Sequence, residues 1–276
     1  MYNARILIIV LVSLCLSVSG CHYFSTDSQI SYGLNHYKMG LYNQAIPTLL
    51  SAVKSLEKES PPDSRLVDVL IALGAMAESE KRNDLAANFY PRALKAADAL
   101  QPTDDKRLRN ALVYLGMFYS YHERAHDALP ILQRAAEISV KLKDQEYHAI
   151  DLDNLASAYQ NLKQYSEAVE FQSRALKVAN ELTAAQFPTR GTILHNLGSS
   201  YMELGRYEEA EAYFKEAITV LNSGGREAEQ WRIKTAKESY TDLRRRMDRA
   251  AEAEKPESPT VHQGAPADAK SGPAEL

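Results

Sequence analysis

A pattern of small residues recurs five times along this chain at a nearly constant interval. Its first series is Gly33, Gly74, Gly116, Ala156 and Gly198. An alanine follows each member twelve residues later, at Ala45, Ala86, Ala128, Ala168 and Ala210, and another follows seven residues after that, at Ala52, Ala93, Ala135, Ala175 and Ala217. Successive members are 41, 42, 40 and 42 residues apart. A period of this length is typical of stacked supersecondary units that cannot bury their apolar faces alone, so the sequence predicts a solenoid.

The fifth unit shows how one repeat is expected to fold. Its first half has apolar residues spaced for one face of a helix, at Ile193, Leu194, Leu197, Tyr201 and Leu204. Gly205-Arg206-Tyr207 interrupts this pattern where a helix would end. Glu208 and Glu209 then favour the start of a second helix, whose apolar face continues through Ala210, Tyr213, Phe214, Ala217, Ile218 and Leu221. Each unit is therefore predicted to be a helical hairpin, with its small residues where the two helices approach closely.

These units resemble tetratricopeptide repeats. In the fifth unit the resemblance rests on Leu197-Gly198, Tyr201, Gly205, Tyr207, Ala210, Phe214 and Ala217. The usual repeat has 34 residues, and the extra length of about eight residues resembles the kinesin-light-chain-type variant. Asn154-Leu155-Ala156 and Asn196-Leu197-Gly198 resemble that variant too, whereas Gln172 stands where a bulky apolar residue is expected. The resemblance implies an all-α fold: a solenoid of five helical hairpins in a right-handed superhelix over residues 27–222, with a C-terminal capping helix.

The N-terminus resembles a bacterial lipoprotein signal. Ile6–Val18 is apolar except for two serines, and its length suits a signal-peptide core but not a membrane-spanning helix of about 20 residues. Val18-Ser19-Gly20-Cys21 then resembles the lipobox. The resemblance implies a signal peptide at 1–20, lipidation of Cys21 and a tether at 21–26. The alternatives are an ordinary secretory signal with a chance cysteine and an uncleaved anchor.

These features also bear on location. His22, rather than aspartate, follows the cysteine, which in Gram-negative lipoproteins points to the outer membrane, so we expect a lipid-anchored protein that faces the periplasm. Cys15, the other cysteine, lies in the segment predicted to be removed, so the mature chain would have no disulfide. A net charge of −4 with both signs interspersed argues against nucleic-acid binding.

Two further segments follow the repeats. A capping helix is predicted at 229–253, with an apolar side formed by Trp231, Ala236, Tyr240, Leu243 and Met247. Arg244-Arg245-Arg246 and Arg249 offer an alternative contact with anionic lipid or cell-wall polymer, although nearby acidic residues dilute their charge. Residues 254–276 are rich in Pro, Ala, Gly and Ser and are expected to be disordered.

One segment matches a catalytic signature. His122-Glu123-Arg124-Ala125-His126 satisfies H-E-x-x-H, the zinc-peptidase signature, whose chemistry needs both histidines on one helical face. In the repeat register, however, this pentapeptide aligns with the turn inside the third hairpin. A solvated turn is the favoured interpretation, and a zinc-dependent peptidase using His122 and His126 is the alternative. Because no other catalytic motif and no phosphate-binding loop is present, we expect neither an enzyme nor a cofactor.

The concave groove is where function is expected. In tetratricopeptide repeat arrays the first helices of successive hairpins line a groove, and the matching positions here include Tyr37, Tyr121, Asn154 and Asn196. Aromatic side chains often dominate binding energy at interfaces, and an asparagine amide can hold the backbone of an extended peptide. Bridging of neighbouring helices is the alternative role for the asparagines. The predicted function is a membrane-anchored periplasmic scaffold that binds a segment of an envelope protein during assembly of pilus, secretion or cell-wall machinery.

Overall fold

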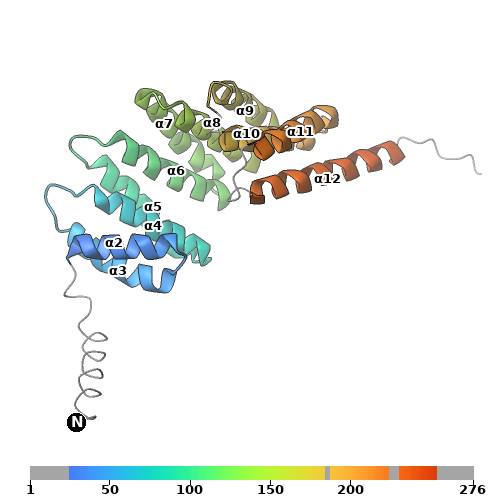
Figure 1. Ribbon diagram of the computed structural model, residues 1–276. Helices are drawn as coiled ribbons and strands as arrows, with labels where there is room; N and C mark the ends of the chain where they lie inside the picture. The colour runs from blue at the N-terminus through green and yellow to red at the C-terminus, as the bar shows by residue number, and fades with distance from the viewer. Residues whose placement is uncertain (1–24, 184–186, 224–229, 254–276) are drawn as a thin grey trace, which may run out of the picture.

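The described part of the chain is entirely helical. A computed structural model describes residues 25–183, 187–223 and 230–253, which form eleven helices and no strand (Figure 1). Ten helices pair as hairpins: α2 (Thr26–Lys38) with α3 (Tyr42–Leu56), α4 (Arg65–Ser79) with α5 (Asn83–Asp98), α6 (Asp105–Tyr121) with α7 (Ala125–Leu142), α8 (Gln145–Asn161) with α9 (Tyr165–Ala179), and α10 (Phe187–Glu203) with α11 (Tyr207–Ser223). The last helix is α12 (Gln230–Ala253). The predicted all-α solenoid is confirmed. The predicted signal peptide, Cys21 and the C-terminal tail lie outside the described residues.

The glycines of the repeat lie where paired helices touch. A methyl group added to Gly74 would stand 2.5 Å from the ring of Tyr90, and one added to Gly198 would stand 2.9 Å from the ring of Phe214. Carbon atoms in contact normally lie about 3.5–4.0 Å apart, so a larger side chain would push the two helices of the hairpin apart. The regularly spaced small residues in the sequence therefore mark the positions where the two helices of each hairpin touch.

The fourth hairpin departs from this pattern in two linked ways. Ala156 takes the glycine position, and Gln172 takes the position that Tyr90 and Phe214 occupy in their own hairpins. Gln172 is fully buried, and its side-chain oxygen accepts a hydrogen bond of 2.8 Å from the hydroxyl of Ser200 in α10. A polar contact between neighbouring hairpins therefore replaces the bulky apolar contact made elsewhere.

The turn inside every hairpin contains one residue in the left-handed conformation. These residues are Gly40 and Gly205, each with a φ of 73°, and Lys81, Glu123 and Lys163, each with a φ of 59°. They repeat with the same spacing as the small residues. Glycine adopts this conformation without the steric penalty that other L-residues suffer, so two of the five turns have the residue that the backbone favours.

The first helices of the hairpins form the inner layer of the solenoid. Contacts between alternate helices join α2 to α4, α4 to α6, α6 to α8 and α8 to α10, and α12 continues the series by contacting α10. Successive second helices within the described residues do not contact each other to a comparable extent. When the helices of neighbouring hairpins approach more closely on one side of the stack, the stack curves toward that side. The face formed by α2, α4, α6, α8, α10 and α12 is therefore the concave one.

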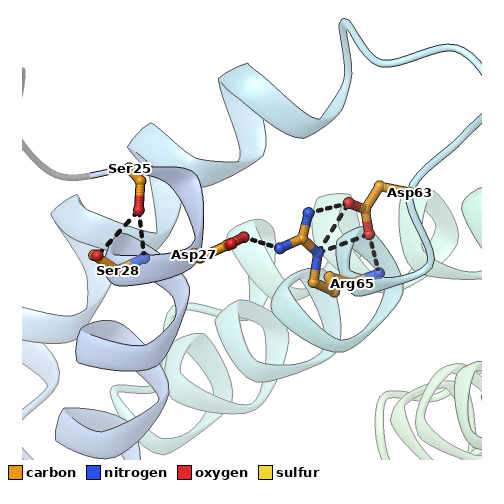
Figure 2. A network of polar contacts seen from close by, with 5 residues as sticks. All are labelled: Ser25, Asp27, Ser28, Asp63 and Arg65. Carbon is orange, nitrogen blue, oxygen red and sulfur yellow. Dashed lines mark hydrogen bonds and ion pairs between the residues drawn. The ribbon is translucent and has the colours of Figure 1, made fainter.

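Ion pairs link neighbouring hairpins along the solenoid. Arg65, at the start of α4, contacts Asp27 in the first turn of α2 and Asp63 in the preceding loop (Figure 2). One hairpin later, Arg107 of α6 lies 2.9 Å from Asp68 of α4. Exposed pairs of this kind contribute about 1 kcal/mol or less, so they orient the hairpins more than they stabilise them.

Helix α12 covers the end of the stack. Ile233 and Ala236 pack against Leu221, and Leu243 packs against Phe214, all from one face of α12. Two members of the arginine cluster are paired within the protein, because Arg244 contacts Glu211 at 3.3 Å and Arg246 contacts Glu203 at 3.0 Å. These contacts favour the capping role over lipid or polymer binding by this cluster. None of the described helices is both long and apolar enough to cross a membrane.

The expected position of Trp231 on the apolar side of this helix is wrong. Its side chain is 61% exposed. At 3.6 residues per turn, Trp231 lies roughly 200° around the helix from Ile233, whereas Ala236, Tyr240 and Leu243 follow Ile233 at intervals of three or four residues. Trp231 therefore faces away from the buried stripe.

Candidate binding site on the concave face

A pocket of about 350 Å³ lies on the concave face near the C-terminal end of the solenoid. Its walls come from α6, with Met117 and Tyr121; from α8, with Asp153, Asn154 and Ser157; from α10, with Thr192, His195 and Asn196; and from the end of the stack, with Leu221, Trp231, Arg232 and Thr235. Three of the four residues predicted to bind a partner, Tyr121, Asn154 and Asn196, therefore meet at one site.

The fourth predicted residue, Tyr37, lies apart from this pocket. It is half-buried on α2, packs against the core of the first hairpins, and has its ring centroid 6.1 Å from that of Tyr42. Burial raises the pKa of Tyr37, and the nearby Tyr114 of α6 raises it further. Tyr37 thus belongs to the N-terminal half of the concave face, and its role in binding stays a prediction.

Two aromatic rings project from the pocket. Tyr121, at the C-terminal end of α6, is 62% exposed, and Trp231, at the start of α12, is 61% exposed. Partial desolvation by the surrounding protein raises the pKa of Tyr121, and the nearby Asp153 and Glu78 raise it further. Large exposed aromatic side chains beside a cavity are typical of binding surfaces.

The two asparagines differ in their hydrogen bonds, although they occupy the same position of the repeat. The side-chain nitrogen of Asn196 donates to Asp153 Oδ2 at 2.8 Å, so this amide bridges α10 to α8. Within the described part of the chain, the half-buried amide of Asn154 has no side-chain hydrogen bond. The bridging role therefore applies to Asn196, and the amide of Asn154 is available to a ligand.

Asp153 is the buried acidic group of the pocket. The residue is 7% exposed, and its Oδ1 has no hydrogen-bond partner among the described residues. Burial raises the pKa of Asp153 to about 7, against a weaker opposing effect of the Asn196 hydrogen bond. An ionised carboxylate in such a place is costly because it has lost its water without gaining a cation.

A hydrogen-bonded chain holds Asp153 in position from α12. His195 Nε2 lies 2.9 Å from the hydroxyl of Ser239 in α12, and His195 Nδ1 lies 3.2 Å from Asn196 Oδ1. Burial lowers the pKa of His195, which favours a neutral ring. A neutral ring that donates from Nδ1 to Asn196 Oδ1 and accepts at Nε2 from Ser239 completes a chain of hydrogen bonds from Ser239 to Asp153 Oδ2. The capping helix thus helps to order the pocket.

The H-E-x-x-H segment spans the turn that its repeat register predicts and the first two residues of α7. His122 follows the last residue of α6, Glu123 has a positive φ, and His126 is in the first turn of α7. The two histidines therefore do not share a helical face. His122 Nε2 lies 3.6 Å from Glu78, while His126 is exposed. Within the described residues no cluster of three or more His, Cys, Asp or Glu side chains could hold a metal ion.

Sequence reasoning places Asp153 and His195 on the groove-facing side of their helices without assigning them a binding role, and it misses Trp231 as a site residue. A signal for the difference between the asparagines does exist in the repeat register. Asp153 precedes the small residue of its repeat by three positions, and the matching residue of the preceding repeat is Val113. Asn196 thus has an acidic partner one repeat earlier, and Asn154 does not.

Comparison with protein families identifies the class of the repeats. A tetratricopeptide repeat model matches residues 107–181, and a second tetratricopeptide repeat model matches residues 191–220. The chain therefore contains tetratricopeptide repeats, as the sequence pattern predicts. These segments include most of α6, all of α8 and the parts of α10 that form the pocket.

Solved structures agree with this class. Repeats from Podosopora anserina, assigned to a kinesin light chain, share 18% identity at a TM-score of 0.59 and cover 70% of this chain and 93% of that chain. The apo form of RapI shares 15% identity at a TM-score of 0.65, with 83% and 87% covered. A Rap protein complexed with competence and sporulation factor shares 16% identity at a TM-score of 0.54, with 83% and 74% covered. Such identities show the fold alone. The comparison with curated proteins found no match.

Proposed function

We propose that this protein is a lipid-anchored interaction scaffold of the cell envelope, and that its concave pocket holds a segment of a partner protein. Proteins with tetratricopeptide repeats bind protein partners. Lipid on Cys21 would hold the chain at the outer membrane, facing the periplasm. The partner would belong to pilus, secretion or cell-wall machinery, and no catalytic step is needed for this role.

The observation that carries the binding role is the grouping of Tyr121, Asn154 and Trp231. Two exposed aromatic rings lie beside an amide that has both donor and acceptor capacity unused within the described part of the chain. Rings of this kind supply much of the binding energy at interfaces, and the amide can pair with the backbone of an extended segment. The similar Rap protein, which is complexed with competence and sporulation factor, supports a binding role for this fold.

The binding role is tested by photo-crosslinking in cells. A photoreactive amino acid at position 121 is expected to give a specific protein adduct, and the same probe at position 32 serves as the control. Tyr32 is also exposed, but it lies on α2 outside the pocket. Asn154→Ala should weaken the adduct at position 121, whereas Asn43→Ala, at an exposed site on α3, should not. Equal adducts from both probe positions, or an adduct that Asn154→Ala leaves unchanged, would contradict the concave pocket as the binding site.

The anchoring is tested separately. Cells are labelled with a fatty-acid analogue, and the wild type is compared with Cys21→Ala and Cys15→Ala. We expect label and outer-membrane fractionation in the wild type and in Cys15→Ala, and their loss in Cys21→Ala. Retention of label by Cys21→Ala, or an intact N-terminus in the mature wild type, would contradict anchoring through Cys21.

A further inference from the structure

The pocket combines exposed aromatic rings with a buried acid. We propose that it accepts a basic side chain, arginine or lysine, from the bound segment, between Tyr121 and Trp231 and over the carboxylate of Asp153. This inference rests on the proposed function and adds the chemistry of the residue that is recognised.

The helix order places these groups around one space. The pocket-forming helices of the inner layer follow one another as α6, α8, α10 and α12. Tyr121 comes from the first of them and Trp231 from the last, so their rings flank Asp153 and Asn196 on the two helices between. Aromatic faces attract ammonium and guanidinium groups. The amide of Asn154, next to Asp153 in the chain, lies in the same pocket and can fix the backbone that carries the basic side chain.

Charge complementarity selects a cation over an anion or a neutral group. Asp153 brings a carboxyl group with an unpartnered oxygen, and the elements around it supply no cation to that oxygen within the described residues. Because Oδ1 is itself scarcely accessible, the carboxylate acts as a buried charge beneath the pocket, or contacts the ligand after a small rotation of its side chain. In either case a bound cation neutralises the charge of Asp153, and their attraction is strong because the buried carboxylate is poorly screened by water.

Arg232 also lines the pocket, and a cation there would by itself favour an acidic ligand. Arg232, however, already interacts with another group of the protein, and its Cζ lies 5.0 Å from the centroid of the Trp231 ring. Arg232 therefore shows that a guanidinium can lie against this ring, most of whose surface stays exposed. Asp153 is the charged group of the pocket whose countercharge the structure does not supply among the described residues.

The test uses peptide probes and the intrinsic fluorescence of the protein. Trp231 is the only tryptophan of the chain, so its emission reports on this pocket without a label. The full chain in detergent at pH 8 is titrated with Ac-Ala-Ala-Arg-Ala-Ala-NH2 and with the same peptide containing citrulline, a neutral isostere of arginine, or glutamate. We expect saturable binding of the arginine peptide, with an affinity about tenfold or more above that of the citrulline peptide.

Substitutions then assign the preference to one carboxyl group. Asp153→Asn keeps an oxygen that can accept from Asn196, and it should abolish the preference for arginine over citrulline. Asp84→Asn, an equal change of charge at an exposed site on α5, should leave the preference intact. Circular dichroism melts of both variants check that the fold is retained.

A pH series supplies an independent readout. The arginine preference should shrink when the pH falls from 8 to 5.5, because Asp153 takes up a proton, and in Asp153→Asn it should not depend on pH. The groups that face Asp153 are Tyr121 of α6, His195 of α10 and Arg232 of α12. Tyr121, whose pKa is raised, does not titrate in this range, and the pKa of His195 is lowered. His195 and Arg232 are present in both proteins, so comparison of the two proteins cancels their effects.

The remaining outcomes separate this inference from the proposed function. Equal binding of all three peptides, or preference for the glutamate peptide, would overturn the basic-residue subsite and leave the groove as a protein-binding site. Absence of a fluorescence change with every peptide up to 10 mM, roughly the weakest affinity such a subsite would have, would also overturn it. The crosslinking experiment at position 121 would then decide the proposed function independently.

Discussion

At the scale of single residues, Asp153 shows how burial couples charge to stability. The charged form loses hydration on folding, so the folded protein keeps the proton of Asp153 up to a pKa of about 7, compared with 3.8 for an unperturbed aspartate. Between these two values the folded state binds a proton that the unfolded state has released. The stabilisation from Asp153 is therefore complete below about pH 4 and is lost as the pH rises to about 7.

The first prediction concerns this pH dependence. The difference in unfolding free energy between the wild type and Asp153→Asn should fall by up to about 4 kcal/mol between pH 4 and pH 7, and then level off. Taking the difference cancels the opposite trend from Asp63 and Asp104, whose pKa values are lowered. Urea unfolding of both proteins between pH 4 and pH 7 measures this difference in unfolding free energy. A difference that stays constant with pH would show that Asp153 titrates normally.

The second prediction concerns a buried ion pair between two hairpins. Arg109 Nε of α6 lies 2.9 Å from Asp151 Oδ2 of α8, and the two side chains are 7% and 0% exposed. Arg109→Met would leave a carboxylate buried without its cation, so we expect a loss of about 3–5 kcal/mol. Arg124→Met removes an exposed pair with Asp127, which water screens, and should have a much smaller effect on stability. Chemical denaturation compares them, and similar losses in the two variants would contradict this account.

At the scale of the elements, the turn of each hairpin repeats one backbone conformation with different residues. Gly205 adopts a positive φ with no neighbouring atom within 4 Å of an added methyl group, so the conformation and not crowding decides the effect of substitution. Lys163 has the same role in the preceding hairpin, with a φ of 59°. A non-glycine residue in this region costs roughly 1–2 kcal/mol, partly offset by the lower entropy of its unfolded chain.

The third prediction follows from this comparison. Gly205→Ala should destabilise the protein by about 1 kcal/mol, and Lys163→Gly should stabilise it by about 0.5–1 kcal/mol. Glu170→Gly, at an exposed site in the interior of α9, provides the control, because glycine there should destabilise the helix by about 1 kcal/mol. Thermal melts show whether each substitution raises or lowers the melting temperature. A lower melting temperature for Lys163→Gly would mean that the lysine side chain contributes contacts that outweigh its backbone strain.

At the scale of the whole molecule, the solenoid is held together by contacts between neighbours. Each helix contacts its partner and the adjacent hairpin, so stability is close to a sum of local terms. Helix α12 is the last of these neighbours, and it covers Phe214 and Leu221 of α11.

The fourth prediction is that the loss of α12 acts locally. Removing residues 224–276 should expose the apolar face of α11 and raise amide hydrogen exchange in α10 and α11, while α2 and α3 keep their protection. Leu243→Ala, at a fully buried position, should give a weaker form of the same pattern and a loss of about 2–5 kcal/mol. Hydrogen exchange measured by mass spectrometry reports separately on α2 and α3 at one end of the solenoid and on α10 and α11 at the other. A uniform increase along the whole chain would indicate one cooperative unit instead.

The positions of the helices and turns were predictable because they depend on short-range patterns. The small residue, the turn and the apolar face all recur within one unit of about 42 residues, and they determine where each helix starts, ends and contacts its partner. The same register placed the H-E-x-x-H segment at the junction between the two helices of the third hairpin. Tyr121, Asn154 and Asn196 could be assigned to the concave face because their positions in the repeat specify which side of the first helix they occupy.

The chemistry of the pocket depended on contacts between repeats, which no single repeat specifies. Asn154 and Asn196 are equivalent in sequence, yet only stacking of α10 on α8 brings Asn196 against Asp153 and leaves Asn154 unpaired among the described residues. Trp231 enters the site because α12 packs on the stack through its opposite face. The sequence by itself determined the repeating helical hairpins, since local periodicity suffices for them. The tertiary structure decided which polar groups are satisfied and which remain for a ligand, because that depends on the distance between side chains about one repeat apart.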